Sequence, residues 1–164
     1  MKNWNDVLTY KNGNLYWRER TANCVQIGAR AGSNAGRGYR HVKYKKQTHM
    51  EHRVVWEMHF GEIPNGLHID HINRNRSDNR IENLRLATPY QNRQNAPSGK
   101  SAPTSEHKGV FWSTARGKWV AALSVRGKQK CLGGFDDEGD AALAYNSAAQ
   151  SAWGEFAYLN EVRL

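Results

Sequence analysis

Cysteine is scarce in this chain, and its distribution excludes two common kinds of small scaffold. The 164 residues include only two cysteines, Cys24 and Cys131, which lie far apart and form no CxxC element. Disulfide-stabilised domains and thiolate zinc knuckles need several cysteines at short, regular spacings. The sequence therefore predicts neither a disulfide framework nor a cysteine-bound zinc ion.

Long hydrophobic runs are also absent. No stretch approaches the roughly 18 apolar residues that a membrane-spanning helix requires. No apolar segment follows Met1-Lys2, as it would in a secretory signal peptide. We therefore expect an intracellular, cytoplasmic protein that has no membrane partner.

Acidic residues are too few to balance the basic ones. The chain has 24 Lys and Arg against 15 Asp and Glu, which gives a net charge of +9 and a pI of about 9.8. Such an excess favours a polyanionic partner, either nucleic acid or an acidic membrane surface. Six Trp and seven Tyr provide enough apolar surface for a folded core, so the chain is not expected to be disordered.

The excess positive charge lies in the first part of the chain. Residues 1–103 carry 17 basic and 8 acidic side chains, whereas residues 104–164 carry 7 of each. Residues 96–105 are small and polar, contain Pro and Gly, and show no apolar periodicity, which indicates a linker. We therefore predict an α+β protein with a domain over 1–95, a linker over 96–105 and a second domain over 106–164.

The first sixty residues predict short strands followed by a helix. Gly13–Trp17 and Gly38–Tyr44 are aromatic, partly alternating segments bounded by glycine, a pattern typical of strands. The apolar spacing over Glu51–Phe60 predicts a helix. His52 and His59 fall on its inner face, where we interpret them as satisfied core histidines.

The next segment carries a carboxylate, an imidazole and two amides in a strand–loop–strand–helix pattern. Asp70 and His71 lie in one predicted strand, and Asn83 lies in the next. Asn92 falls in the first turns of a helix for which Thr88 is the expected N-cap. Carboxylate and amide oxygens suit Mg²⁺ or Mn²⁺, and an imidazole can take a proton from water near neutral pH. These groups suit metal-dependent hydrolysis of a phosphodiester.

This segment resembles the HNH endonucleases, whose ββα-metal fold occurs in phage and intron homing enzymes. The similarity covers at least residues 50–95 and includes the Asp-His pair and both asparagines. The resemblance implies that Asp70 and Asn92 bind one divalent metal ion, Mg²⁺ or Mn²⁺. His71 would be the general base on the attacking water, and Asn83 would orient that histidine or brace the loop.

Residues 106–164 predict a three-stranded antiparallel sheet packed on one helix. Three short aromatic or apolar segments are separated by turns that contain glycine. A helix is expected to begin at Asp136, with acidic residues in its first turn, and to end at Gly154. Depending on the strand register, the sheet face opposite this helix is expected to carry Trp112, Trp119 and the basic side chains of the strands and turns.

This second part is similar to the plant ethylene-response-factor (ERF) or Apetala-type DNA-binding domain. The similarity covers almost all of residues 107–160 and includes Lys108-Gly109-Val110 and the segment Gly117–Ala121. The resemblance implies a sheet that lies in the major groove of DNA. Phe111 stands where the family has arginine, so the plant domain's sequence preference is not expected here.

The predicted nucleic-acid contacts come from both domains. They are Arg74, Arg76, Arg85, Arg93, Lys108, Trp112, Arg116, Lys118, Trp119, Arg126, Lys128 and Lys130.

Together these patterns predict a site-specific DNA endonuclease of the homing type, active in a bacterium or a phage-infected host. A single active site on a monomer predicts that one strand of double-stranded DNA is nicked. Two alternatives remain open: a non-catalytic, sequence-specific DNA-binding regulator, and a nonspecific HNH nuclease.

Overall fold

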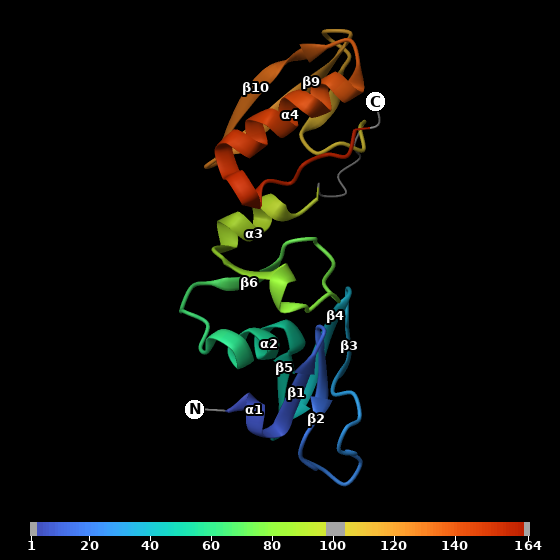
Figure 1. The fold of residues 1–164 in the computed structure, drawn as a ribbon. Helices are drawn as coiled ribbons and strands as arrows, with labels where there is room; N and C mark the ends of the chain where they lie inside the picture. Colours follow the sequence, from blue (N-terminus) through green and yellow to red (C-terminus); the bar gives the residue numbers. More distant parts are fainter. Residues whose placement is uncertain (1–2, 98–103, 163–164) are drawn as a thin grey trace. The chain divides into compact units, whose positions relative to one another are not determined.

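The chain divides into two compact units, Met1–Pro89 and Tyr90–Leu164, and Figure 1 shows the computed structural model. The structure describes residues 3–97 and 104–162. Most of the predicted 96–105 linker therefore lies outside the described residues. The α+β class expected from the sequence is confirmed.

The first unit consists of small antiparallel sheets around a helix. Its elements are α1 (Trp4–Val7), β1 (Leu8–Lys11), β2 (Asn14–Trp17), β3 (Ser33–Gly36), β4 (Tyr39–Tyr44), β5 (Gln47–Met50), α2 (Glu51–Phe60), β6 (His68–His71), a 3₁₀ turn η1 (Ile81–Asn83) and β7 (Leu84–Ala87). β1 pairs with β2, β3 to β5 form a meander, and β6 pairs with β7. The sequence predicted β2, β4 and α2, but it missed the short strands β1, β3 and β5.

One apolar core joins these pieces. Leu15 of β2, Val42 of β4, Val55 of α2, Ile69 of β6 and Leu84 of β7 are all buried in it. Burying each such side chain contributes about 1.5–3 kcal/mol relative to leaving it exposed. The hairpin of β6 and β7 therefore packs against the preceding strands and α2 through this shared core.

A buried carboxylate fixes the start of α2. Glu51 is fully buried, and its carboxylate accepts from Arg40 Nε at 2.8 Å and from Arg30 Nη2 at 3.4 Å. Arg40 Nη2 also donates to the carbonyl of Gly32 at 3.1 Å. A buried charge must be paired to be tolerated, and a negative charge in the first turn favours the helix. These contacts fix α2 against β4 and so fix the position of the next residue, His52.

The second unit is a three-stranded sheet covered by one helix. Its elements are α3 (Pro89–Asn95, whose first residue belongs to the first unit), β8 (Val110–Ser113), β9 (Lys118–Val125), β10 (Lys128–Phe135), α4 (Glu138–Trp153) and a 3₁₀ turn η2 (Gly154–Phe156). The strand order is β10–β9–β8, and α4 lies across one face of the sheet (Figure 1). The sequence prediction of this arrangement is confirmed.

The ends of α4 follow the expected capping chemistry with a small shift. The helix begins at Glu138 rather than Asp136, because the Asp137 side chain accepts from the backbone N–H groups of Gly139 and Asp140. Gly154 ends the helix in the left-handed region, as expected. Ala141 and Tyr145 of α4 pack against the sheet. Gly109, at φ +76°, approaches the Tyr145 ring so closely that a β-carbon would overlap it.

The strand register corrects the expected distribution of side chains over the two sheet faces. Trp112 pairs with Trp119, two residues along each strand from the pair formed by Val110 and Ala121, which packs under α4. Because paired residues share a face and successive residues alternate, both tryptophans point to the side covered by α4. Lys128 and Lys130 are paired with Val125 and Leu123 and share that side, but both side chains are exposed because β10 is an edge strand. Arg116, in the turn between β8 and β9, and Lys118 remain on the open side.

No helix in residues 3–97 or 104–162 is both long enough and apolar enough to cross a membrane.

Candidate active site

The Asp70–His71 pair lies at the end of β6 and is almost fully buried. Each residue is only 5 % exposed. In the antiparallel register Asp70 lies opposite Arg85, and His71 lies opposite Leu84. The pairing with β7 therefore places the carboxylate and the imidazole at the start of the loop that follows β6.

Asn79 orients the imidazole. His71 Nε2 lies 3.0 Å from Asn79 Oδ1, and Asn79 is 1 % exposed. Since an amide oxygen only accepts, the imidazole donates from Nε2, and the lone pair of the neutral ring is then on Nδ1. This is a tautomer that can accept a proton. Sequence reasoning missed Asn79, because an asparagine in a polar loop gives the same signal as an ordinary turn residue.

Asn83 braces the loop between β6 and β7. Its Oδ1 accepts from the backbone N–H of Asn73 at 2.9 Å, and its Nδ2 donates to the carbonyl of Asp78 at 2.7 Å. The sequence offered two roles for Asn83, and these contacts correspond to the bracing role. The contact that orients His71 comes from Asn79.

A salt bridge stiffens the same loop. Arg80 donates from Nε to Asp78 Oδ1 and from Nη2 to Asp78 Oδ2, both at 2.8 Å. Asn73 Nδ2 donates to the second of these oxygens at 2.7 Å. The hydrogen bonds from Arg80 hold the pKa of the Asp78 carboxyl well below its usual range. The loop is therefore closed by contacts among its own side chains.

Arg85 holds the Asp70 carboxylate. Its Nε and Nη2 lie 2.9 Å and 2.8 Å from Asp70 Oδ2, and its side chain is only 11 % exposed. Arg85 was expected to contact DNA, whereas here its guanidinium is engaged inside the site. Both guanidinium nitrogens converge on one oxygen of the Asp70 carboxylate, and such charge-assisted contacts are stronger than neutral ones.

The metal-binding potential of this site depends on donors other than acids and imidazoles. Within residues 3–97 and 104–162, no group of three or more His, Cys, Asp or Glu side chains could hold a metal ion. A metal bound through Asp70 would therefore need amide, water or phosphate oxygens to complete its coordination. Such oxygens are the ligands that Mg²⁺ accepts.

Aromatic rings enclose His71. The His52 ring lies edge-on to the His71 ring with centroids 5.2 Å apart, and Tyr39 lies 5.4 Å from His52 and 6.1 Å from His71. Burial lowers the pKa of His71, against the opposing effects of the Asn79 hydrogen bond and the Asp70 charge. His71 is therefore neutral at neutral pH.

His52 lies in the core, as the sequence predicted. Its hydrogen bonding is incomplete, however, whereas the sequence interpretation expected both ring nitrogens to be bonded. His52 is 8 % exposed, and its Nδ1 has no hydrogen-bond partner among the described residues. Burial, followed by the charge of His71, lowers the pKa of His52 to about 3. His59, also expected inside, is exposed. It packs on Tyr10 at 4.6 Å between ring centroids.

The depressed pKa of His52 predicts acid sensitivity of the first unit. Below pH 6.5 the unfolded chain takes up a proton at this position and the folded chain does not, so stability present above pH 6.5 is lost as the pH falls toward 3. The free energy of opening should fall by about 2 kcal/mol between pH 6.5 and 5. Amide hydrogen exchange of Val54 and Val55 measures that opening.

His52→Phe is the matched variant, because phenylalanine keeps a ring beside Tyr39 and His71 but cannot be protonated. It should reduce this pH dependence to the part that comes from the lowered pKa of His71, while exchange at pH 7.5 stays close to that of the parent chain. An equal loss of protection on acidification in both proteins would show that another group is responsible.

The remaining predicted residues of this region lie in the loop and on α3. Arg74 and Arg76 are exposed, and the Arg76 guanidinium lies 5.0 Å from the centroid of the Tyr39 ring. Asn92 is half-buried and Arg93 exposed on α3, whose residues from Tyr90 onward belong to the second unit.

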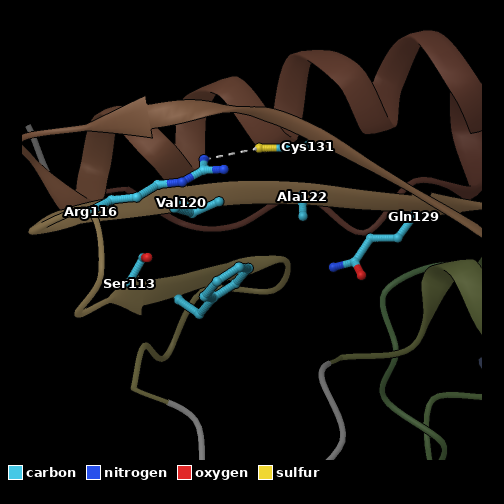
Figure 2. A pocket seen from close by; sticks show the side chains of 7 residues that line it. Ser113, Arg116, Val120, Ala122, Gln129 and Cys131 are labelled. Carbon is cyan, nitrogen blue, oxygen red and sulfur yellow. Dashed lines mark hydrogen bonds between the residues drawn. The ribbon is translucent and has the colours of Figure 1, made fainter.

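The open face of the second unit carries a pocket of mixed chemistry. Figure 2 shows it, with a hydrogen bond of 3.8 Å from Arg116 Nη1 to Cys131 Sγ across it. The lining residues are Phe111, Ser113, Arg116, Val120, Ala122, Gln129 and Cys131. Lys118, on the same face by register, pairs with Asp136 at 3.1 Å. The face therefore combines a guanidinium, an amide and small apolar groups.

The comparison with known families concerns the region of the His71 site. Residues 49–94 match the HNH endonuclease family model. This matched segment is called the HNH domain below. The matched range contains Asp70, His71, Asn83 and Asn92, so the resemblance noted from the sequence is confirmed.

Relatives of the chain fall into two groups. Protein 3.8 of Escherichia phage T7 is 44% identical over 78 residues, 48% of this chain and 64% of the relative. An uncharacterized HNH endonuclease of Acanthamoeba polyphaga mimivirus is 32% identical over 122 residues, 74% of this chain and 62% of the relative. A putative dehydration-responsive element-binding protein of Arabidopsis thaliana is 37% identical over 82 residues, 47% of this chain and 52% of the relative. The chain spans less than two thirds of the length of each of these relatives.

The HNH domain and the compact units have different boundaries. The family match continues to residue 94, whereas the first unit ends at Pro89. α3, which carries Asn92, therefore belongs to the HNH domain by sequence and to the second unit by its contacts.

Proposed function

We propose that this chain is a metal-dependent DNA endonuclease in which the HNH domain cleaves the phosphodiester and residues 106–164 bind the DNA. The observation that carries the proposal is the buried His71 imidazole, which Asn79 orients beside Asp70 inside the segment that matches the HNH family. A buried, oriented and neutral imidazole next to a carboxylate is suited to general-base catalysis.

His71 removes a proton from the attacking water. Its Nε2–H is donated to Asn79, so Nδ1 is the nitrogen that accepts the proton. Because burial lowers the pKa of His71, the ring is neutral and ready to accept at pH 7. The edge-on ring of His52 and the tilted ring of Tyr39 limit rotation of the imidazole, which keeps the base aligned.

Asp70 and Asn92 would hold the divalent cation, for which both Mg²⁺ and Mn²⁺ are suitable. When bound, such a cation would offset charge on the phosphate and on the departing oxygen. Arg85 fixes the Asp70 carboxylate, and Asn83 keeps the loop closed through Asn73 and Asp78.

The second unit supports recognition of a particular DNA sequence. Its open face presents Arg116 and Gln129, side-chain types that make bidentate hydrogen bonds to guanine and adenine edges in the major groove. Phe111, Val120 and Ala122 would suit contact with thymine methyl groups. Exposed basic residues serve as phosphate contacts: Arg74, Arg76, Arg93, Arg126, Lys128 and Lys130.

A nuclease domain joined to a separate DNA-binding domain explains how a small nuclease cleaves at a specific DNA sequence. Binding of residues 106–164 to their DNA sequence raises the effective concentration of the nuclease domain at the adjoining DNA. This arrangement supports site-specific, homing-type cleavage of double-stranded DNA. One HNH site on a monomer would nick one strand.

The proposal is tested with supercoiled plasmids that carry a library of phage and bacterial genomic fragments. With Mg²⁺ or Mn²⁺, a subset of plasmids should be converted to the open-circle form, and EDTA should stop the conversion. Cutting of every plasmid regardless of insert would instead indicate a nonspecific nuclease. Tight gel shifts of selected fragments without any cleavage would indicate a non-catalytic regulator.

A further inference from the structure

α3 carries the proposed metal ligand Asn92, yet its described contacts are with the second unit. The residue that holds its last turn is Lys108, which the sequence had assigned to DNA. We infer that Lys108 is a positioning residue that anchors α3 for catalysis rather than a phosphate contact. This inference rests on the proposed nuclease function.

The Lys108 ammonium caps the carboxyl end of α3. Its Nζ donates to the carbonyl of Gln94 at 2.8 Å and to the carbonyl of Ala96 at 2.6 Å. Carbonyl groups at the end of a helix lack partners within the helix, and a cation is favourable there. Two of the three donors of the ammonium are thus used on α3 and on the residue just after it.

The backbone of Lys108 is itself clamped. Its N–H donates to Asn160 Oδ1 at 2.7 Å, and its carbonyl accepts from Asn160 Nδ2 at 3.0 Å. Asn160 is buried, and its backbone N–H and carbonyl are bonded in turn to the Asn146 side chain at 2.7 Å and 2.9 Å. Because Asn146 lies on α4, a continuous chain of hydrogen bonds connects α4 to the last turn of α3.

The first turn of α3 is tied to the same unit. The Tyr90 hydroxyl accepts from Trp153 Nε1 at 3.2 Å and from the backbone N–H of Arg126 at 3.3 Å. Trp153 is the last residue of α4, and Arg126 lies in the turn between β9 and β10. The helix is therefore fastened at both ends by the part of the chain that resembles a DNA-binding domain.

The contacts that hold α3 are expected to affect catalysis and not DNA binding. An isolated helix of seven residues is not stable by itself in water, so the position of Asn92 depends on these tertiary contacts. Loss of the Lys108 cap should loosen α3 and slow cleavage. It should leave the number of phosphate contacts unchanged, because the ammonium is engaged by the two carbonyl groups.

The test compares Lys108→Met with Lys128→Met in the full chain. Lys128 is exposed on β10, so Lys128→Met should weaken DNA binding measured in EDTA. It should also reduce the slope of log K against log salt concentration by about one. Lys108→Met should keep affinity within about twofold and keep the wild-type salt dependence. It should lower kcat at least tenfold at unchanged KM, and accelerate amide exchange of residues 91–95 at least tenfold.

The outcomes are distinguishable. Equal losses of affinity and salt dependence in both variants, with unchanged exchange in α3, would overturn the anchoring role. Faster exchange with unchanged kcat would overturn its link to catalysis. If the parent chain cleaves no DNA, the proposed function fails and the inferred catalytic role fails with it, and exchange in α3 still reports whether Lys108 anchors the helix.

Discussion

His71→Ala is expected to lower the rate of DNA cleavage by about a thousandfold, within the range that a positioned general base contributes. The methyl group cannot accept the proton of the attacking water, whereas the surrounding loop keeps its own contacts through Asn83 and Asp78. Binding should therefore be preserved. Single-turnover cleavage with Mg²⁺ measures the rate, and gel shifts in EDTA measure the affinity.

His68→Ala is the matched control for this substitution. His68 begins the same strand, β6, but its side chain is exposed, and none of the contacts described around His71 involves it. Its removal should leave the cleavage rate within about twofold of the parent. Equal losses in both variants would contradict the assignment of the base to His71.

Sequence reasoning succeeded where the signal is local. The helix of residues 51–60 follows from apolar spacing and a terminal glycine, and the start of α3 follows from Thr88-Pro89. The strand that carries Asp70 and His71 was also predicted, and it forms β6. Each of these features is decided by neighbours within a few residues, which a single sequence displays directly.

Features that depend on tertiary contacts were missed. The faces of the C-terminal sheet are set by the pairing register, including an irregularity between Cys131 and Gly133, and no local pattern specifies that register. Lys108 was predicted to contact DNA, which stays a prediction, but its hydrogen bonds to the carbonyl groups of Gln94 and Ala96 gave no signal in the sequence. A positive side chain serves either purpose, and only the fold distinguishes them.

The predicted strand that contains Asn83 needs a smaller correction. Its first part forms the 3₁₀ turn Ile81–Asn83, and pairing begins at Leu84. The turn directs Asn83 back to the loop, where it bonds the backbone at Asn73 and Asp78. The bracing function of Asn83 therefore depends on this departure from regular strand geometry.

Asn79→Leu should lower kcat about 10- to 100-fold, a range found for residues that orient a reactive side chain. Leucine has a similar size but offers no acceptor to His71 Nε2, so the imidazole loses its fixed tautomer and orientation. DNA affinity and KM should not change, because Asn79 is buried within the loop. Pre-steady-state cleavage separates these quantities.

The pH profile distinguishes orientation from general damage to the loop. The hydrogen bond that His71 donates to Asn79 raises the pKa of His71 against the larger effect of burial, so its loss in Asn79→Leu should move the acid limb of kcat/KM to lower pH. Asn79→Asp supplies a carboxylate acceptor that favours the charged imidazole. It should recover most of kcat at pH 8 and move the acid limb to higher pH. If both variants lose activity equally and their acid limbs coincide, Asn79 supports only the loop, and His71 must be aligned by its ring contacts with His52 and Tyr39.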